Sequence, residues 1–287
     1  MARQCTNRAC AAHQTQFVQR QNGLEKSHRV PQSHHQPTIT GVFGIGKTTV
    51  RDPSWATHRC YFQAAYPGCQ NPISIITPGV SKADWGYDKA AAKRVFGLAE
   101  DAFVIAFVGN RYDIKGLPTL LQSFKALPEH VNLLAVGNAE QIGIYQAQTE
   151  KLGIAQRVQF LGAMDSVDEV YQAADALVHP TLEDTFAMVV LEAMSYGLPV
   201  VVSCEKYCGI AGLLTNGLNA LILEEPKNAV ALAERLRQLT NSAVDSVDNS
   251  KDLREKLGSE ALKFASSYAW TQIARQQLFL YEKIIKK

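Results

Sequence analysis

Residues 176–203 constrain the fold of this chain more than any other stretch does. Their first part, Ala176–His179, is an apolar run that ends at Pro180, which is typical of a buried strand in a parallel sheet. A polar loop rich in helix-capping residues follows, and residues 186–196 are almost wholly apolar, as in a buried helix that ends at Gly197. A second apolar run closes the stretch. The predicted order is therefore strand, loop, helix, turn and strand.

Glu192 is the only charged side chain in this predicted helix. An unpaired carboxylate buried there would cost on the order of several kcal/mol. Asp184 precedes the helix, and a helical rise places the two carboxylates about 10–12 Å apart. That spacing suits the sugar and the ribose of a nucleotide diphosphate sugar, with the pyrophosphate over the helix N-terminus. An alternative stays open, in which Asp184 is only an N-cap and Glu192 pairs with a buried arginine.

The stretch resembles the donor-site signature of the family-four retaining glycosyltransferases. Glu-Ala-Met at 192–194 and Gly-Leu-Pro-Val-Val at 197–201 match the family tail, and Asp184 occupies the place of the family's first glutamate. The resemblance implies hexosyl transfer from a nucleotide diphosphate sugar, with retention at the anomeric carbon. Asp184, or its neighbour Glu183, would then hold sugar hydroxyls, and Glu192 would hold the ribose. Backbone amides of the loop would meet sugar and phosphate oxygens; they belong to Thr185, Phe186, Ala187 and Met188.

A second motif follows the apolar run 103–108 and resembles the family's Gly-Arg-x4-Lys-Gly loop. Lys115 falls on the family lysine, which neutralises the donor pyrophosphate, while Asn110 occupies the arginine position and Arg111 comes one residue later. The flanking Gly109 and Gly116 would let the backbone approach the donor. The resemblance thus names Asp184, Glu192 and Lys115 as the catalytic residues.

A third motif, Arg157–Gly162, is similar to the strand and turn whose backbone meets the nucleotide base. Leu161 and Gly162 are therefore further donor-binding candidates, and the alternative of an ordinary buried strand end stays open. His179 is expected to be a packed core residue rather than a catalyst. The sequence has no Asp-x-Asp and no Cys-x-x-Cys, so we expect no metal and no cofactor apart from the donor substrate.

Predicted strands and helices alternate along most of the chain. The strands are predicted at 73–76, 103–108, 131–136, 157–161, 176–179, 199–203 and 220–223, and the helices at 89–95, 117–127, 140–152, 167–173, 186–196, 227–239, 250–267 and 270–285. This alternation predicts an α/β fold, a Rossmann-like doubly wound parallel sheet with C-terminal helices. Ligands of such sheets bind at the carboxyl ends of the strands.

The first part of the chain has a different character. Residues 1–55 lack periodicity and are predicted to be largely disordered and outside the family match, residues 56–80 to form a linker and the first strand, and residues 81–287 the donor domain of GT-B type. An acceptor domain of a complete GT-B enzyme has no counterpart in this sequence. The sequence therefore supports two hypotheses: a hexosyltransferase, and a truncated donor domain that binds nucleotide sugar without catalysis.

Residues Gly41–Thr48 fit the P-loop pattern and would place Lys47 on a phosphate. A P-loop must follow a buried strand and open a helix, yet the preceding segment is polar and contains Pro37, and Pro53 follows closely. A P-loop nucleoside triphosphatase is accordingly a low-ranked alternative.

Charge and hydropathy limit the classes of partner that this chain is expected to bind. The net charge of +2 divides into +6 for residues 1–60 and −4 for the remainder, so the body of the chain is not expected to bind nucleic acid. No apolar run reaches the ~18 residues of a membrane span, and no secretory leader is apparent, which predicts a cytoplasmic protein. The resemblance implies a UDP-sugar as donor and a glycan or lipid-linked saccharide of the lipopolysaccharide-core type as acceptor, with peripheral contact to the inner membrane face.

Overall fold

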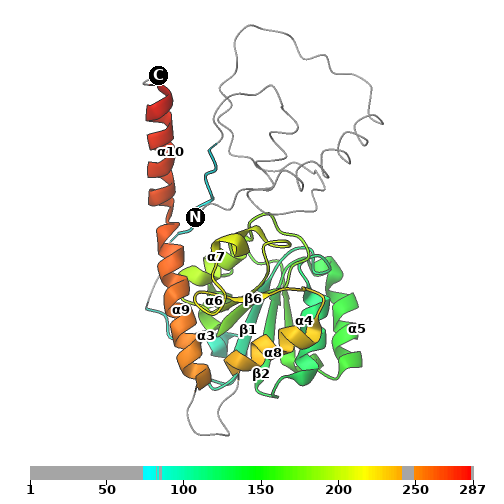
Figure 1. The fold of residues 1–287 in the computed structure, drawn as a ribbon. Helices are drawn as coiled ribbons and strands as arrows, with labels where there is room; N and C mark the ends of the chain where they lie inside the picture. Colours follow the sequence, from blue (N-terminus) through cyan, green and yellow to red (C-terminus); the bar gives the residue numbers. More distant parts are fainter. Residues whose placement is uncertain (1–73, 82, 84–85, 241–248, 286–287) are drawn as a thin grey trace, which may run out of the picture. The chain divides into compact units, whose positions relative to one another are not determined.

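The computed structural model describes residues 74–81, 83, 86–240 and 249–285. Six parallel strands form one sheet in the order β3-β2-β1-β4-β5-β6 (Figure 1). This order is that of a Rossmann-type sheet, which winds outward in both directions from the central pair β1 and β4. The predicted doubly wound fold is confirmed. The predicted disordered segment and the P-loop pattern at 41–48 lie outside the described residues.

The strands and helices follow one another in strict alternation up to β5. The strands are β1 (Phe103–Val108), β2 (Val131–Val136), β3 (Val158–Gly162), β4 (Ala176–His179), β5 (Val200–Ser203) and β6 (Leu221–Leu223). The α-helices are α3 (Lys89–Val95), α4 (Leu117–Ser123), α5 (Ile142–Leu152), α6 (Asp168–Ala173), α7 (Met188–Ser195), α8 (Ala229–Thr240), α9 (Asn249–Ser267) and α10 (Trp270–Ile285). Short 3-10 turns are η1 (Phe124–Ala126), η2 (Ala139–Gln141), η3 (Ala155–Arg157) and η4 (Gly209–Leu213).

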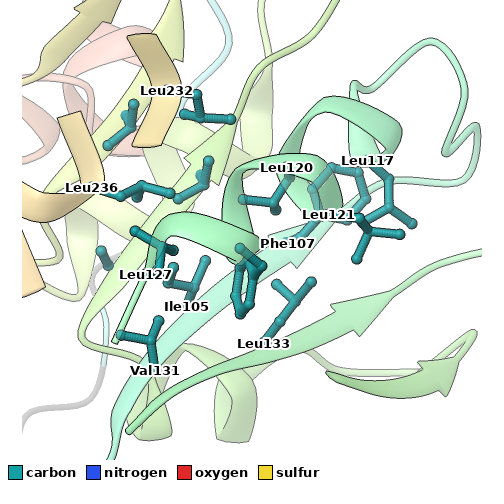
Figure 2. Packing of buried hydrophobic residues seen from close by; sticks show 14 of the residues in the cluster. Ile105, Phe107, Leu117, Leu120, Leu121, Leu127, Val131, Leu133, Leu232 and Leu236 are labelled. Carbon is teal, nitrogen blue, oxygen red and sulfur yellow. The ribbon is translucent and has the colours of Figure 1, made fainter. Parts of the chain in front are cut away.

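The main hydrophobic core lies on one face of the sheet, under α4 and α8 (Figure 2). Alternate residues of β1 contribute to it, among them Ile105 and Phe107, which are fully buried. Leu120 of α4 and Leu236 of α8 pack against the same face. Burial of each such side chain contributes about 1.5–3 kcal/mol, so the core fixes the strands whose ends carry the polar loops.

Two boundaries differ from the prediction. The strand predicted at 73–76 is wrong for its described part, since residues 74–76 are not in a strand. The chain is instead anchored at Val80, which forms an isolated bridge with Ala269 at the junction of α9 and α10. Gly79 lies so close to Trp270 that a β-carbon would come within 2.8 Å of the indole ring, so the chain passes directly against it.

The predicted helix 117–127 is correspondingly shorter, because it passes from α4 into the 3-10 turn η1. The predicted helix 140–152 likewise begins with the 3-10 turn η2 before α5. Across the described residues, none of the helices is both long and apolar enough to cross a membrane.

Candidate functional site

The loops that follow β1 and β4 meet at the carboxyl edge of the sheet, where the winding direction reverses. The amide of Leu182 donates to the carbonyl of Ile114 at 2.7 Å, which ties the two loops together. Gly116 has a φ of 84°, and a β-carbon there would come within 1.9 Å of the Pro180 carbonyl oxygen. Only glycine therefore permits this approach, and the sequence thereby brings the Lys115 loop beside the acidic loop.

Lys115 and Asp184 form the centre of the site. The Lys115 Nζ lies 2.6 Å from Asp184 Oδ2 and also donates to the Glu183 carbonyl at 3.0 Å. The Nε2 atom of His179, the last residue of β4, lies 3.0 Å from the same Asp184 Oδ2. The structure thus unites two predicted catalytic residues, and adds a histidine that was predicted to serve only packing.

The main chain of Asp184 is fixed from a third direction. Its amide donates to the Tyr207 carbonyl at 2.8 Å, and its carbonyl accepts from the Gly209 amide at 3.0 Å. These bonds come from the segment that follows β5. Asp184 is therefore held between the carboxyl ends of β4 and β5, so its carboxylate has a defined position rather than the mobility of a surface side chain.

The second carboxylate oxygen of Asp184 determines where α7 begins. Its Oδ1 accepts hydrogen bonds from the amides of Phe186 at 3.2 Å and Ala187 at 2.7 Å. Ala187 has a φ of 64°, in the left-handed region, so the helix begins at Met188. The helix predicted from residue 186 is thus wrong at its start. The estimate of 10–12 Å along one helix loses its basis, because Asp184 precedes a non-helical turn.

Charge and burial act in opposite directions on this cluster. Burial alone would raise the pKa of Asp184, but the hydrogen bond from His179 and the Lys115 ammonium outweigh it and hold that pKa well below its usual range. Burial of the His179 ring lowers its pKa and outweighs the opposing effect of Asp184. At neutral pH Asp184 is therefore a carboxylate and His179 a neutral imidazole.

Glu192 lies farther along α7, and its hydrogen-bond partner is not the buried arginine of the alternative interpretation. The buried Tyr171 of α6 donates its hydroxyl to Glu192 Oε2 at 3.1 Å. The pairing with a buried arginine is therefore wrong. Burial raises the pKa of Glu192, and the bond from Tyr171 opposes that rise. One oxygen of the carboxylate is thus bound by Tyr171.

The other residues of the loop that follows β1 differ in exposure and in their contacts. Gly109 lies against the stem of Lys115, since a β-carbon there would come within 2.8 Å of the lysine Cγ. Asn110 is exposed. Arg111 is exposed too, and its guanidinium lies 3.1 Å from Asp113 Oδ2. Of the two basic residues in this loop, Lys115 is therefore the one in contact with the acidic loop.

The third predicted motif lies at the end of β3, two positions from β1 in the sheet. Leu161 is half-buried, and Gly162 has a φ of 72° with its carbonyl accepting from the Gly137 amide at 2.9 Å. Thr185 and Met188 are half-buried, and Glu183 is exposed. Within the described part of the chain, no group of three or more His, Cys, Asp and Glu side chains could hold a metal ion.

Two contacts of the site were not predicted from the sequence. His179 carries a signal of its own, a polar residue at the end of an otherwise apolar strand, but that signal does not say what it touches. Tyr171 carries none, since it occupies an apolar position of a short helix and its hydroxyl meets Glu192 only after α6 and α7 pack.

The backbone at Ala187 leads to a stability prediction. Of the non-glycine residues that the structure describes, only Ala187 has a positive φ. Because a β-carbon is strained there, Ala187→Gly should raise the free energy of unfolding by about 1 kcal/mol. Ala274→Gly, in the exposed middle of α10, is the matched control and should lower it by about 0.5–1 kcal/mol. Urea unfolding measures both, and a decrease in both variants would contradict the strain at Ala187.

The family model described as "Glycosyl transferases group 1" matches residues 88–264. The chain is 32% identical over 219 residues to the lipopolysaccharide glucosyltransferase WaaG of Escherichia coli K12, a match that covers 73% of this chain and 58% of WaaG. It is 28% identical over 238 residues to the D-inositol 3-phosphate glycosyltransferase of Corynebacterium urealyticum, covering 77% and 54%.

The fold is similar to that of a solved structure of Anabaena Alr3699/HepE in complex with UDP and glucose. The TM-score is 0.68 at 20% identity, over 82% of this chain and 62% of the other. The chain spans little more than half the length of the two curated relatives named above, 58% and 54%.

Proposed function

Because the chain belongs to the glycosyl transferase group 1 family, we propose that the carboxyl edge of its sheet binds a nucleotide diphosphate sugar, with a UDP-sugar favoured as donor. The observation that carries this proposal is the position of Lys115 against Asp184, at the point where the winding of the sheet reverses. Such a point is the usual ligand site of an open α/β sheet. Here it offers one cation for phosphate and carboxylates for hydroxyls.

Each group has a role in this proposal. The Lys115 ammonium binds the diphosphate, because a lysine at a loop end is a point charge that phosphate oxygens can approach. Asp184, or the exposed Glu183, accepts hydrogen bonds from the sugar hydroxyls, and Glu192 accepts them from the ribose. The ends of β1 and β3 provide backbone for the phosphates and the base, through Gly109, Asn110, Arg111, Gly116, Leu161 and Gly162.

The diphosphate must compete with Asp184 for Lys115. The lysine is already paired at 2.6 Å, with side-chain exposures of 22% for Lys115 and 16% for Asp184. A diphosphate carries more negative charge than one carboxylate, so it can replace Asp184 as the partner of the ammonium. The carboxylate would then keep its bonds to His179 and to the loop amides, and gain a free lone pair for a sugar hydroxyl.

The proposed reaction is hexosyl transfer with retention. The bond between the anomeric carbon and the β-phosphate oxygen breaks, its electron pair passes to the leaving diphosphate, and Lys115 stabilises the charge that develops there. The acceptor hydroxyl forms the new bond on the same face, and its proton passes to an oxygen of the leaving diphosphate. Because Lys115 supplies the positive charge, the proposal includes no metal and no resident cofactor.

The acceptor in this proposal is a glycan or a lipid-linked saccharide of the lipopolysaccharide-core type. The similarity to WaaG, which is a lipopolysaccharide glucosyltransferase, supports that choice. The proposed place of reaction is the cytoplasm, with peripheral contact to the inner membrane face. The second candidate function is donor binding without independent catalysis, since the proposed donor contacts at Lys115 and Asp184 lie within this one sheet domain.

Calorimetric titration with UDP, UDP-glucose and ATP tests the proposal. We expect binding of UDP and UDP-glucose, and much weaker binding of ATP. Binding of ATP that is lost in Lys47→Ala would overturn the proposal in favour of the P-loop pattern. Hydrolysis or transfer of glucose in the presence of a saccharide acceptor would separate the transferase from the candidate that only binds.

A further inference from the structure

The ring of His179 is buried in a way that apolar packing does not require. The residue is 1% exposed, and its Nδ1 atom has no hydrogen-bond partner among the described residues. A buried polar atom without a partner destabilises a fold, and a leucine of similar size would avoid that cost. Among the described residues the ring makes one polar contact, between Nε2 and Asp184 Oδ2, at 3.0 Å. The contact with Asp184 therefore best explains why a histidine occupies this buried position.

The direction of this hydrogen bond follows from the charge on Asp184. The carboxylate accepts from Lys115, Phe186 and Ala187, so it is ionised and has no proton to donate. The Nε2 atom must therefore carry the hydrogen. The neutral imidazole is then the Nε2–H tautomer, and the unpartnered Nδ1 is an acceptor.

His179 differs from Lys115 in how well it can orient the carboxylate. Lysine is a flexible chain with three rotatable donors, and its ammonium is needed by the diphosphate in the proposed function. The imidazole is rigid, and it stands at the end of β4, whose residues are all buried. When the diphosphate takes Lys115, His179 is the remaining side chain on Asp184 Oδ2.

We propose that His179 is a positioning residue that holds the Asp184 carboxylate in place for the sugar of the donor, a role that rests on the proposed function. The imidazole does not touch the reacting atoms. It fixes one oxygen of Asp184 while the loop amides of Phe186 and Ala187 fix the other. The specificity of the site for the sugar part of the donor, rather than for the nucleotide, thus depends on His179.

Two variants separate this role from packing. His179→Leu keeps an apolar side chain of similar size and removes the donor, whereas His179→Gln places an amide N–H near the position of Nε2. We expect His179→Leu to lower the affinity for UDP-glucose relative to UDP by about tenfold, since a hydrogen bond to a charged group is lost. His179→Gln should recover most of that ratio. The affinity for UDP alone should change by less than about threefold, because UDP lacks the sugar.

A double-variant measurement connects the effect to Asp184. In the Asp184→Asn background, His179→Leu should cause no further change in the ratio, because the carboxylate that it orients is already gone. Additive losses would overturn the proposal, as would equal losses for UDP and UDP-glucose, or identical behaviour of the glutamine and leucine variants. If the unmodified chain binds neither ligand, the proposed function fails, and the role of His179 in it fails too.

Nitrogen NMR of the imidazole tests the hydrogen bond without any ligand. We expect the His179 signals of a neutral Nε2–H tautomer, which Asp184→Asn should shift. A proton on Nδ1 at neutral pH would overturn the assignment, whatever the binding data show. This readout separates failure of the His179 inference from failure of the proposed function.

Discussion

Lys115→Gln is expected to weaken UDP binding by about 10- to 100-fold while leaving uridine binding nearly unchanged. A charge-assisted hydrogen bond to phosphate contributes about 1.5–3 kcal/mol, and about 1.4 kcal/mol corresponds to tenfold in affinity. Glutamine retains a donor for Asp184, so the carboxylate is not left unpartnered when the ammonium is removed. Calorimetric titration of both ligands measures the difference, because uridine has no phosphate.

Lys125→Gln provides the matched control. Lys125 is an exposed lysine of η1, and its removal changes the net charge by the same amount. We expect no more than a twofold change in UDP affinity for that variant, since screening by salt weakens distant charges. An equal loss for UDP and uridine in Lys115→Gln would mean that the lysine supports the fold rather than the diphosphate.

Glu192→Ala is expected to lower UDP affinity by about 10- to 100-fold, and here uridine should be affected equally. The reason is that the ribose hydroxyls lose their acceptor whether or not phosphates are present. A sharper version compares UDP with 2′-deoxy-UDP. The unmodified chain should prefer UDP, and Glu192→Ala should bind the two ligands with similar affinity, because the variant has no carboxylate to recognise the 2′-hydroxyl.

The control for this experiment is Glu234→Ala, which removes an exposed glutamate from α8. It should leave both affinities unchanged. If Glu192→Ala still prefers UDP over 2′-deoxy-UDP, Glu192 is not the residue that recognises the 2′-hydroxyl of the ribose. Because burial raises the pKa of this carboxyl, we also expect the preference to weaken as the pH falls toward that pKa and the acceptor is protonated.

The sheet could be predicted closely because of where its strands lie. The bounds of β1, β2 and β4 agree residue for residue with the prediction, since strands buried on both faces appear as apolar runs with polar residues or proline at their ends. The start of α7 could not be predicted in this way. It depends on the Asp184 carboxylate, which accepts hydrogen bonds from two loop amides, and on the left-handed conformation of Ala187. Neither feature produces a periodic pattern in the sequence.

The strand expected at 73–76 shows the opposite case. Its run of apolar residues has the composition of a strand. A strand also needs a neighbouring strand with which to form hydrogen bonds, and that neighbour depends on the whole fold. The described part of that segment has only the bridge at Val80. Local propensity was therefore insufficient there.

The motifs identified Lys115, Asp184 and Glu192 from their places in the chain, and the family that the motifs resemble is confirmed. Their partners could not be identified in the same way. The Lys115–Asp184 contact joins residues 69 positions apart in the sequence. It depends on the close approach of the Gly116 backbone to the Pro180 carbonyl. Tyr171 and His179 became visible as partners only when the elements packed.

The most direct test of the central claim is a crystal structure of this chain with UDP-glucose bound. We predict the diphosphate at Lys115, the ribose hydroxyls within hydrogen-bond distance of Glu192, and the glucose beside Asp184. Donor bound away from the carboxyl ends of β1 and β4, or a diphosphate that leaves the Lys115–Asp184 pair unaltered, would contradict the account.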